Sequence, residues 1–253
     1  MNEGAPSGEP AGGTTPAGAA TEEQAARWVR EMFGRVVSRY DLLNHVLSFR
    51  MDRAWRRRTG QRVAPVLMRP EARVLDLCCG TGDLAFELAA LRGALIYASD
   101  FCHPMLVEAR RKNTRVSAPC VWFEADALRL PLADQSFDLI TVAFGFRNFA
   151  NYRAGLLELR RVLKPDGLLA VLEFSKPPNR FFAWGYDLYS RHLLPRIGAL
   201  LSGSSDAYAY LPESVRKFPG AERLAEEMRA AGFSAVEFER MTFGVVALHL
   251  ARV

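Results

Sequence analysis

The feature that most constrains this chain is an alternation of short apolar runs and helical segments between residues 73 and 174. Five apolar runs are predicted as strands, at 73–77, 94–99, 120–124, 137–144 and 167–174. The helical segments between them lie at 83–91, 104–113 and 152–163. A strand, a helix and a strand repeated in this way predict a parallel sheet with helices on both faces.

The end of the chain predicts one reversed strand. A helix at 221–231 is followed by two strands, at 235–241 and 245–252. The connection between these strands is only three residues long, and so short a connection joins antiparallel neighbours. The predicted fold class is therefore α/β and Rossmann-like, with a seven-stranded, mostly parallel sheet, one antiparallel strand and helices on both faces.

The remaining segments complete the expected organisation. Residues 1–20 hold five Gly, five Ala and three Pro but no Leu, Ile or Val, so we expect a disordered tail. Residues 21–253 are expected to form a single domain. It opens with N-terminal helices (21–70), the first of them capped by Thr21 and Gln24. Residues 175–219 are an insert rich in aromatic residues and prolines, without a clear strand.

Charge and cysteines narrow the function classes. Residues 50–73 hold eight arginines against two acidic residues, a local charge of +6 in a chain of net charge +5. Such a block suits nucleic acid, an anionic membrane surface or a solvated helix face. No apolar run approaches the ~20 residues that cross a bilayer. The four cysteines lack C-x-x-C spacing, which argues against a metal site and suits reduced thiols in the cytoplasm.

The strongest local motif is Val74-Leu75-Asp76-Leu77-Cys78-Cys79-Gly80-Thr81-Gly82-Asp83. It predicts a strand, a glycine turn and a helix N-terminus. Gly80 and Gly82 allow a sharp turn and a close approach of the backbone to a ligand. The N–H groups of the first helical turn favour an anionic group. A purely structural turn is the alternative interpretation.

Polar residues follow the next strands. Asp100 ends the second strand about 20 residues beyond the glycine turn, where an acid accepts the hydroxyls of a ribose. Asp126 and Ala127 follow the third strand, and residues 137–145 form the fourth. Ligands of open parallel sheets lie at the carboxyl ends of the strands. Together these positions predict a site for an adenosine-type ligand.

The identity of that ligand is constrained by the same turn. It lacks the Lys-Ser/Thr of a Walker loop, but Gly80 to Ala85 also fits the dinucleotide pattern G-x-G-x-x-A. Two features argue against a dinucleotide. Asp76 lies just before the turn, where it repels a pyrophosphate and attracts an ammonium group. The chain also ends in an antiparallel pair instead of a second mononucleotide-binding half.

These motifs resemble the class I S-adenosylmethionine-dependent methyltransferases over residues 73 to 253. A narrower resemblance is to the C-methyltransferase family of quinone biosynthesis. It rests on scattered stretches, of which the most specific are Phe144-Gly145-Phe146-Arg147-Asn148 and Leu172-Glu173-Phe174-Ser175-Lys176-Pro177. Further matches are Tyr40-Asp41 with Asn44, Arg53-Ala54-Trp55-Arg56, Tyr186-Asp187-Leu188-Tyr189-Ser190, Tyr208-Ala209-Tyr210-Leu211 and Val246-Ala247-Leu248-His249.

The resemblance implies S-adenosyl-L-methionine as methyl donor, with contacts at Thr81, Asp100, Asp126 and Ala127. It implies methylation of demethylmenaquinol, the last step of menaquinone biosynthesis, or of 2-polyprenyl-6-methoxy-benzoquinol. Ala143 departs from the pattern, because many members carry Ser there. The other classes considered are an RNA methyltransferase, a non-catalytic assembly protein that binds the cofactor and a nicotinamide enzyme, and nucleic acid is not an expected partner.

A quinol is the expected substrate form, because loss of a phenolic proton places charge on the ring carbon that is methylated. We expect Arg147 to stabilise the phenolate and Asn148 to orient the ring. Arg147 is alternatively a structural partner of Asp126 or Glu173. The sequence does not single out a proton acceptor among Asp126, Tyr186, His192 and His249. The aromatic residues of 181–201 are candidates for a groove for the prenyl tail, and the arginine block with Trp55 for peripheral membrane contact.

Overall fold

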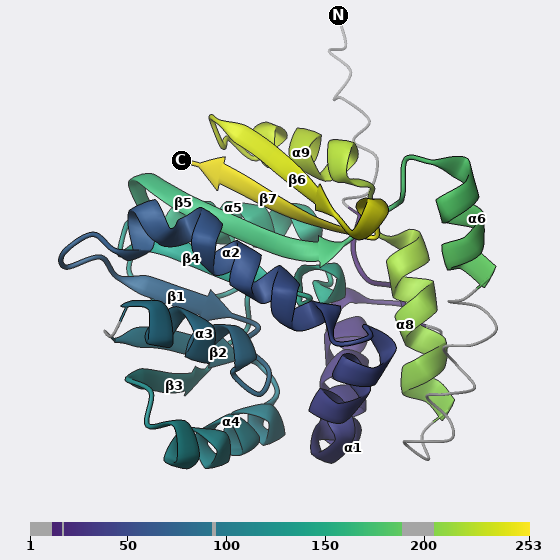
Figure 1. The fold of residues 1–253 in the computed structure, drawn as a ribbon, viewed down its shortest axis with the longest axis horizontal. Helices are drawn as coiled ribbons and strands as arrows, with labels where there is room; N and C mark the ends of the chain where they lie inside the picture. The colour runs from purple at the N-terminus through teal and green to yellow at the C-terminus, as the bar shows by residue number, and fades with distance from the viewer. Residues whose placement is uncertain (1–11, 17, 93–94, 189–204) are drawn as a thin grey trace, which may run out of the picture.

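The computed structural model describes residues 12–16, 18–92, 95–188 and 205–253, and their centre is a seven-stranded sheet (Figure 1). The strand order is β3-β2-β1-β4-β5-β7-β6. The strands are β1 (Val74–Leu77), β2 (Ile96–Asp100), β3 (Cys120–Glu124), β4 (Phe137–Ala143), β5 (Leu163–Phe174), β6 (Val236–Met241) and β7 (Val246–Arg252). β7 runs antiparallel to both of its neighbours and is the one strand of this sheet that points the opposite way, which confirms the predicted fold class.

One strand begins earlier than predicted. β5 starts at Leu163, which pairs with Phe137, and the register then shifts so that Leu168 faces Leu139. Between them lies a turn at the exposed Pro165-Asp166, with Asp166 in the left-handed region. The turn is thus an irregularity inside the strand rather than a loop before it.

Helices cover both faces of the sheet (Figure 1). α2 (Met51–Leu67) and α3 (Asp83–Arg92) pack on one face, and α5 (Tyr152–Val162) and α9 (Ala221–Ala230) on the other. α4 (His103–Val116) packs beside β2 and β3. Within the part of the chain that the structure describes, no helix is long and apolar enough to cross a membrane.

Three helices lie beyond the carboxyl ends of the parallel strands. They are α1 (Glu22–Leu47), α6 (Arg180–Leu188) and α8 (Ser205–Lys217). The expected cap of α1 is present, since the Thr21 hydroxyl accepts the N–H of Gln24 at 3.2 Å. α1 packs on α4 and α8, so it spans the edge of the sheet where the strands end.

Part of the segment expected to be a disordered tail is packed. Thr14 is 6% exposed, and its backbone N–H donates to the carbonyl of Phe149 at 2.8 Å. The expectation was wrong for residues 12–16 because composition does not register backbone hydrogen bonds to a distant loop. Residues 1–11 lie outside the described part of the chain, as do residues 189–204 of the insert.

Candidate active site

The turn between β1 and α3 has the backbone that its glycines predict. Gly80 and Gly82 have φ of +55° and +90°, a region that other residues rarely adopt. A Cβ on Gly82 would also lie 2.6 Å from the ring of Trp122. The turn is therefore tight, and it presents backbone rather than side chains to the end of the sheet.

Asp100 ties this turn to β2. Its carboxylate accepts the N–H of Gly80 at 2.8 Å and the N–H of Cys102 at 2.9 Å. The side chain is buried, and burial raises its pKa to about 6. The carboxylate keeps lone pairs for further donors, as acceptance of two ribose hydroxyls requires.

Two cavities lie at this end of the sheet, and the smaller one opens beside the Asp100 carboxylate. Four of the predicted cofactor residues line it, namely Gly80, Asp100, Asp126 and Ala127. Its volume is about 60 Å³, below the range of about 300–1,000 Å³ of ordinary ligand pockets. Ala26, Phe33 and Tyr40 of α1 close one side. A nucleoside-sized ligand therefore requires these α1 side chains to move aside.

Three other predicted cofactor residues do not line this cavity. The Thr81 hydroxyl donates to Asp41 of α1 at 2.5 Å. Gly82 supports the turn by its backbone. Asp76 is buried within β1, where it accepts the Thr141 hydroxyl at 2.7 Å while its other oxygen has no partner among the described residues. Burial raises the pKa of Asp76 to about 7, and its role toward a ligand stays a prediction.

An ionic latch holds α1 over the turn. Lys112 of α4 donates to Asp41 at 2.9 Å and to Asp83 at 2.5 Å, and it also reaches the Thr81 hydroxyl. The latch thus joins α1, α4 and the start of α3. It places Tyr40 against Gly80, where a Cβ would lie 3.8 Å from the Tyr40 ring.

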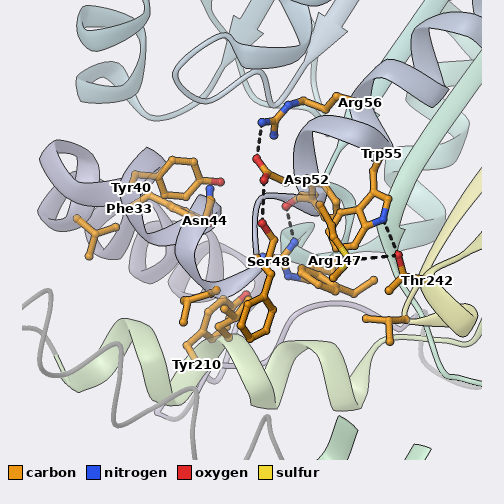
Figure 2. Close-up of a pocket in the computed structure, with 18 of the residues that line it drawn as sticks. Phe33, Tyr40, Asn44, Ser48, Asp52, Trp55, Arg56, Arg147, Tyr210 and Thr242 are labelled. Atoms are coloured by element: carbon orange, nitrogen blue, oxygen red, sulfur yellow. Dashed lines mark hydrogen bonds and ion pairs between the residues drawn. The ribbon is translucent and has the colours of Figure 1, made fainter. Parts of the chain in front are cut away.

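A larger cavity of about 290 Å³ lies on the other side of Tyr40 (Figure 2). Its lining is mainly apolar and comes from α1, α2, α8, the end of β5 and the segments after β4 and β6. Phe33, Tyr40 and Phe144 line both cavities, so they form the wall between them. Burial raises the pKa of Tyr40, which keeps its hydroxyl protonated.

Arg147 lies in the wall of the larger cavity and is anchored from behind. Its Nη1 donates to Glu173 at 3.0 Å and to the carbonyl of Phe144 at 2.5 Å. Burial alone would lower the pKa of Arg147, but the charge of Glu173 outweighs it and holds that pKa above its usual value. The guanidinium is therefore a fixed positive charge at an apolar cavity, and the structural partner considered from the sequence is Glu173.

Asn148 faces the other way. It lines the smaller cavity, not the larger one, and its Oδ1 accepts the Tyr210 hydroxyl at 2.9 Å. The two neighbouring residues of the F-G-x-R-N motif therefore serve different cavities. This differs from the expectation that both face the substrate ring, because the short helix at 146–148 turns successive side chains apart.

The larger cavity also contains an acid that the sequence analysis did not single out. Asp52 of α2 is 3% exposed and accepts from Ser48 at 2.8 Å and from Arg56 at 2.5 Å (Figure 2). His45 Nδ1 lies 2.7 Å from the same carboxylate. Burial would raise the pKa of Asp52, but the bond from Ser48 and the charges of Arg56 and His45 lower it below its usual value. In the sequence, the only feature that marks Asp52 is its place as an acidic residue between arginines.

The candidates for proton acceptor that were named from the sequence do not lie together in one cavity. His249 is 2% exposed, lines neither cavity and donates Nε2–H to the carbonyl of Ala221. Burial lowers its pKa to about 4, so as a proton acceptor at the site it was a wrong candidate. Asp126 lines the smaller cavity. The side chain of Tyr186 and the whole of His192 lie outside the described residues.

Four of the eight arginines of the block, at positions 56, 57, 58 and 62, form ion pairs within the protein. Arg58 and Arg62 of α2 bond to Glu239 and Glu237 of β6. Trp55 is 4% exposed, and its indole N–H donates to the Thr242 hydroxyl at 2.8 Å (Figure 2). The prediction that Trp55 docks on lipid was therefore wrong, because this side chain closes the larger cavity.

Comparison with known proteins agrees with this geometry. Residues 19–252 match the ubiE/COQ5 methyltransferase family. The chain is 50% identical over 220 residues to the demethylmenaquinone methyltransferase of Thermus thermophilus, covering 87% of this chain and 98% of that protein. It is 39% identical over 231 residues to the ubiquinone/menaquinone biosynthesis C-methyltransferase UbiE of Cereibacter sphaeroides, covering 90% and 91%.

Solved structures resemble the fold at low sequence identity. The [4+2]-cyclase SpnF has a TM-score of 0.65 at 18% identity, covering 95% of this chain and 98% of that one. A SAM-dependent methyltransferase from Thermotoga maritima has a TM-score of 0.62 at 20% identity, covering 88% and 98%. These similarities concern the arrangement of the sheet and helices.

Proposed function

The chain belongs to the ubiE/COQ5 methyltransferase family, and on this basis we propose that it methylates a ring carbon of demethylmenaquinol to give menaquinol. One observation carries the proposal: a cavity at the strand ends and a larger apolar cavity share a wall of three aromatic residues. A methyl donor and an apolar ring can be held on the two sides of such a wall. The protein is an S-adenosylmethionine-dependent methyltransferase.

The choice of ring follows the relatives. Those named demethylmenaquinone methyltransferase are 43–50% identical to this chain, and one named for both quinone pathways is 39% identical. The second candidate is therefore methylation of 2-polyprenyl-6-methoxy-benzoquinol, in addition or instead. Both substrates are quinols with prenyl tails, and the apolar lining of the larger cavity suits either ring.

The residues around the smaller cavity fit the cofactor. The glycine turn offers open backbone, and the buried Asp100 carboxylate offers acceptors for ribose hydroxyls. S-adenosylmethionine supplies an electrophilic methyl group when bound. With Phe33 and Tyr40 moved aside to admit the cofactor, the aromatic side chains that line both cavities exclude water and leave one direction of approach between donor and ring, which lowers the entropic part of the barrier.

The larger cavity supplies the charge that the ring needs. Arg147 is a fixed cation in an apolar wall, where electrostatic interactions are stronger than in water. We assign to it the stabilisation of the phenolate formed from the quinol. Asn148 is assigned to the junction with the smaller cavity, where its amide helps to set the donor and ring relative to each other.

Asp52 is our candidate for accepting the phenolic proton, directly or through water. It is an ionised carboxylate in the lining of the larger cavity, and it lies within hydrogen-bond distance of His45. The His45 side chain is 21% exposed, so the pair connects the cavity with solvent. General-base catalysis contributes about 10²–10⁴-fold to a rate, and the lowered pKa of Asp52 places its contribution at the lower end of that range.

We further propose peripheral contact with the cytoplasmic face of a membrane, where a quinol tail resides, through an aromatic surface formed by α6 and Phe243. Phe181, Trp184 and Phe243 are 85%, 71% and 69% exposed, and Phe243 stacks on Phe182 at 4.4 Å. Thr242 and Val245, on either side of Phe243 in the sequence, line the larger cavity. A bilayer is the partner that suits exposed aromatic rings beside the cavity of an apolar substrate.

A competition experiment tests the function. Purified protein receives S-adenosylmethionine with equal amounts of demethylmenaquinol and demethylated benzoquinol, both kept reduced, and the products are measured by mass spectrometry. Methylation of the naphthoquinol alone supports the first candidate, and methylation of both rings supports a shared enzyme. Methylation of neither ring, with the cofactor still bound, contradicts the proposal.

A further inference from the structure

Residues 12–16, here called the N-terminal strap, cross the end of the active site. The Thr14 N–H donates to the carbonyl of Phe149 at 2.8 Å, and the carbonyl of Gly12 accepts the N–H of Tyr152 at 2.9 Å. Lys217 of α8 donates to the carbonyl of Thr15 at 3.1 Å. The strap thereby joins α8 to the segment that follows Arg147 and Asn148.

The strap lies too close to this segment for a side chain at one position. A Cβ on Gly13 would lie 1.9 Å from the carbonyl oxygen of Ala150, which is backbone and cannot swing away. A Cβ on Gly12 would meet only the Tyr152 ring, at 3.6 Å, an ordinary contact. The two adjacent glycines therefore differ sharply in what they tolerate.

The side chain of Thr14 continues the connection into the site. Its Oγ1 lies 2.6 Å from the Tyr210 hydroxyl, which donates to Oδ1 of Asn148 at 2.9 Å. Thr14 and Tyr210 are both buried, at 6% and 6% exposure. Tyr210 lines the larger cavity and Asn148 the smaller one. The hydrogen-bonded chain thus passes between the two cavities.

The Tyr210 hydroxyl has one proton, which it donates to Oδ1 of Asn148. With the amide in this orientation, Tyr210 accepts the proton of Thr14. The hydrogen-bonded chain thus holds Asn148 in place beside Tyr210.

We propose that Thr14 is a positioning residue that orients Tyr210 and Asn148 for methyl transfer. The proposal rests on the proposed function for its kinetic readout. The family match begins at residue 19, so the strap lies before it. The hydrogen bond from Thr14 is therefore a contribution to the site from outside the matched stretch. The position of the Thr14 hydroxyl depends on two further features, which are the backbone hydrogen bonds of the strap and the absence of a side chain at Gly13.

The first test removes the hydroxyl alone. Thr14→Val should slow single-turnover methylation about threefold to tenfold per active site and weaken binding of S-adenosylhomocysteine about threefold. Thr14→Ser should restore both. The matched control is Thr15→Val, at the next position, which is exposed and whose hydroxyl bonds to Lys217 rather than to Tyr210. In a Tyr210→Phe background, Thr14→Val should have no further effect.

The second test displaces the strap. Gly13→Ala should reproduce the effect of Thr14→Val, whereas Gly12→Ala should not. Thr14→Val at the wild-type rate, or an effect that adds fully to Tyr210→Phe, would overturn the proposal. If the wild type methylates neither quinol, the proposed function fails separately. The strap is then judged by S-adenosylhomocysteine affinity, and equal affinities of Gly13→Ala and Gly12→Ala overturn it.

Discussion

Arg147 and Glu173 form an ion pair in which both side chains are almost fully buried, with 3.0 Å between Nη1 and Oε1. Glu173 also accepts the backbone N–H of Arg147 and of Phe174. The pair therefore holds the carboxyl end of β5 to the segment after β4. Its charges are compensated only while both partners are present.

Arg147→Ala should consequently damage both folding and catalysis. Leaving Glu173 buried without its partner costs about 3–5 kcal/mol. Arg147→Met with Glu173→Gln removes both charges and should recover most of that stability, while turnover stays lost and S-adenosylhomocysteine still binds. Chemical denaturation and turnover measured on both variants separate the two effects. Recovered turnover in the double variant would contradict the role assigned to the guanidinium.

Cofactor affinity should depend on the protonation of Asp100. Its pKa is raised to about 6 by burial, so the acceptor carboxylate is lost as the pH falls through 6. Binding of S-adenosylhomocysteine should weaken between pH 7 and pH 5. Asp100→Asn should weaken it about tenfold or more at pH 8, since hydrogen bonds to charged groups contribute about 1.5–3 kcal/mol. The exposed Asp134→Asn serves as control, and an unchanged pH profile in Asp100→Asn would oppose this assignment.

Asp76 should make the folded protein less stable as the pH rises. Its pKa is about 7 in the fold, against about 3.9 in an unfolded chain, so the folded state holds the extra proton between these values. Stability then decreases from pH 4 to pH 7, by on the order of 2–4 kcal/mol. Asp76→Asn should flatten this slope and be more stable than wild type at pH 8, as measured by thermal unfolding.

Asp138 provides a control of opposite sign for that experiment. It bonds to Lys164 at 2.7 Å and to the N–H of Arg73 at 2.8 Å, and these bonds and the Lys164 charge hold its pKa below the usual value despite some burial. Its contribution is present above pH 4 and lost as the pH falls through its lowered pKa. Asp138→Asn should therefore destabilise at pH 7 and converge with wild type in acid. The same slope in both variants would argue against the burial of Asp76 as the cause.

Replacing the proposed proton acceptor should affect chemistry more than binding. Asp52→Asn should reduce kcat about 10²-fold or more while S-adenosylhomocysteine affinity stays within twofold. Ser48→Ala, which removes one bond to the same carboxylate, should have a small effect. Because the pKa of Asp52 is lowered, its ionisation should leave the rate flat between pH 6 and pH 9. A wild-type rate in Asp52→Asn would eliminate it as acceptor.

Membrane contact should depend on aromatic rings rather than on the arginine block. Trp184→Ser and Phe181→Ser should each reduce sedimentation with lipid vesicles severalfold. Val107→Ser, at a 52% exposed position of α4, controls for loss of apolar surface elsewhere. Arg58→Gln should leave vesicle binding unchanged, because that arginine pairs with Glu239. A loss with Arg58→Gln but not with Trp184→Ser would reverse the proposal.

Local sequence signals predicted the sheet and the place where its parallel strands end together. The seven strands follow apolar runs, and Gly80 and Asp100 meet because parallel strands end at one edge. The contacts that close the site were beyond such reasoning. Thr14 and Tyr210 are 196 positions apart, and Trp55 and Thr242 are 187 apart. Their pairing depends on how α1, α2 and α8 settle on the sheet, which no local pattern encodes.

The residues whose roles were not predicted correctly have one property in common, which is that their burial could not be read from the sequence. Trp55 and His249 were judged by side-chain type, as a lipid anchor and a base, but both are buried and bonded to neighbouring parts of the fold. Asp52 was counted only as a charge against the arginines around it. Burial decides these roles, and burial of a polar residue on a helix depends on tertiary packing.

The arginines of α2 have a consequence for the open edge of the sheet. β6 is an outermost strand, and a bare edge of this kind offers unpaired backbone groups to other chains. Its Glu237 and Glu239 are held by Arg62 and Arg58, which keeps charged side chains beside that edge. A second strand docking on this edge would have to pass these ordered ion pairs. Two arginines of a block that suits nucleic acid in the sequence thus serve in the fold to flank the edge strand with charged side chains.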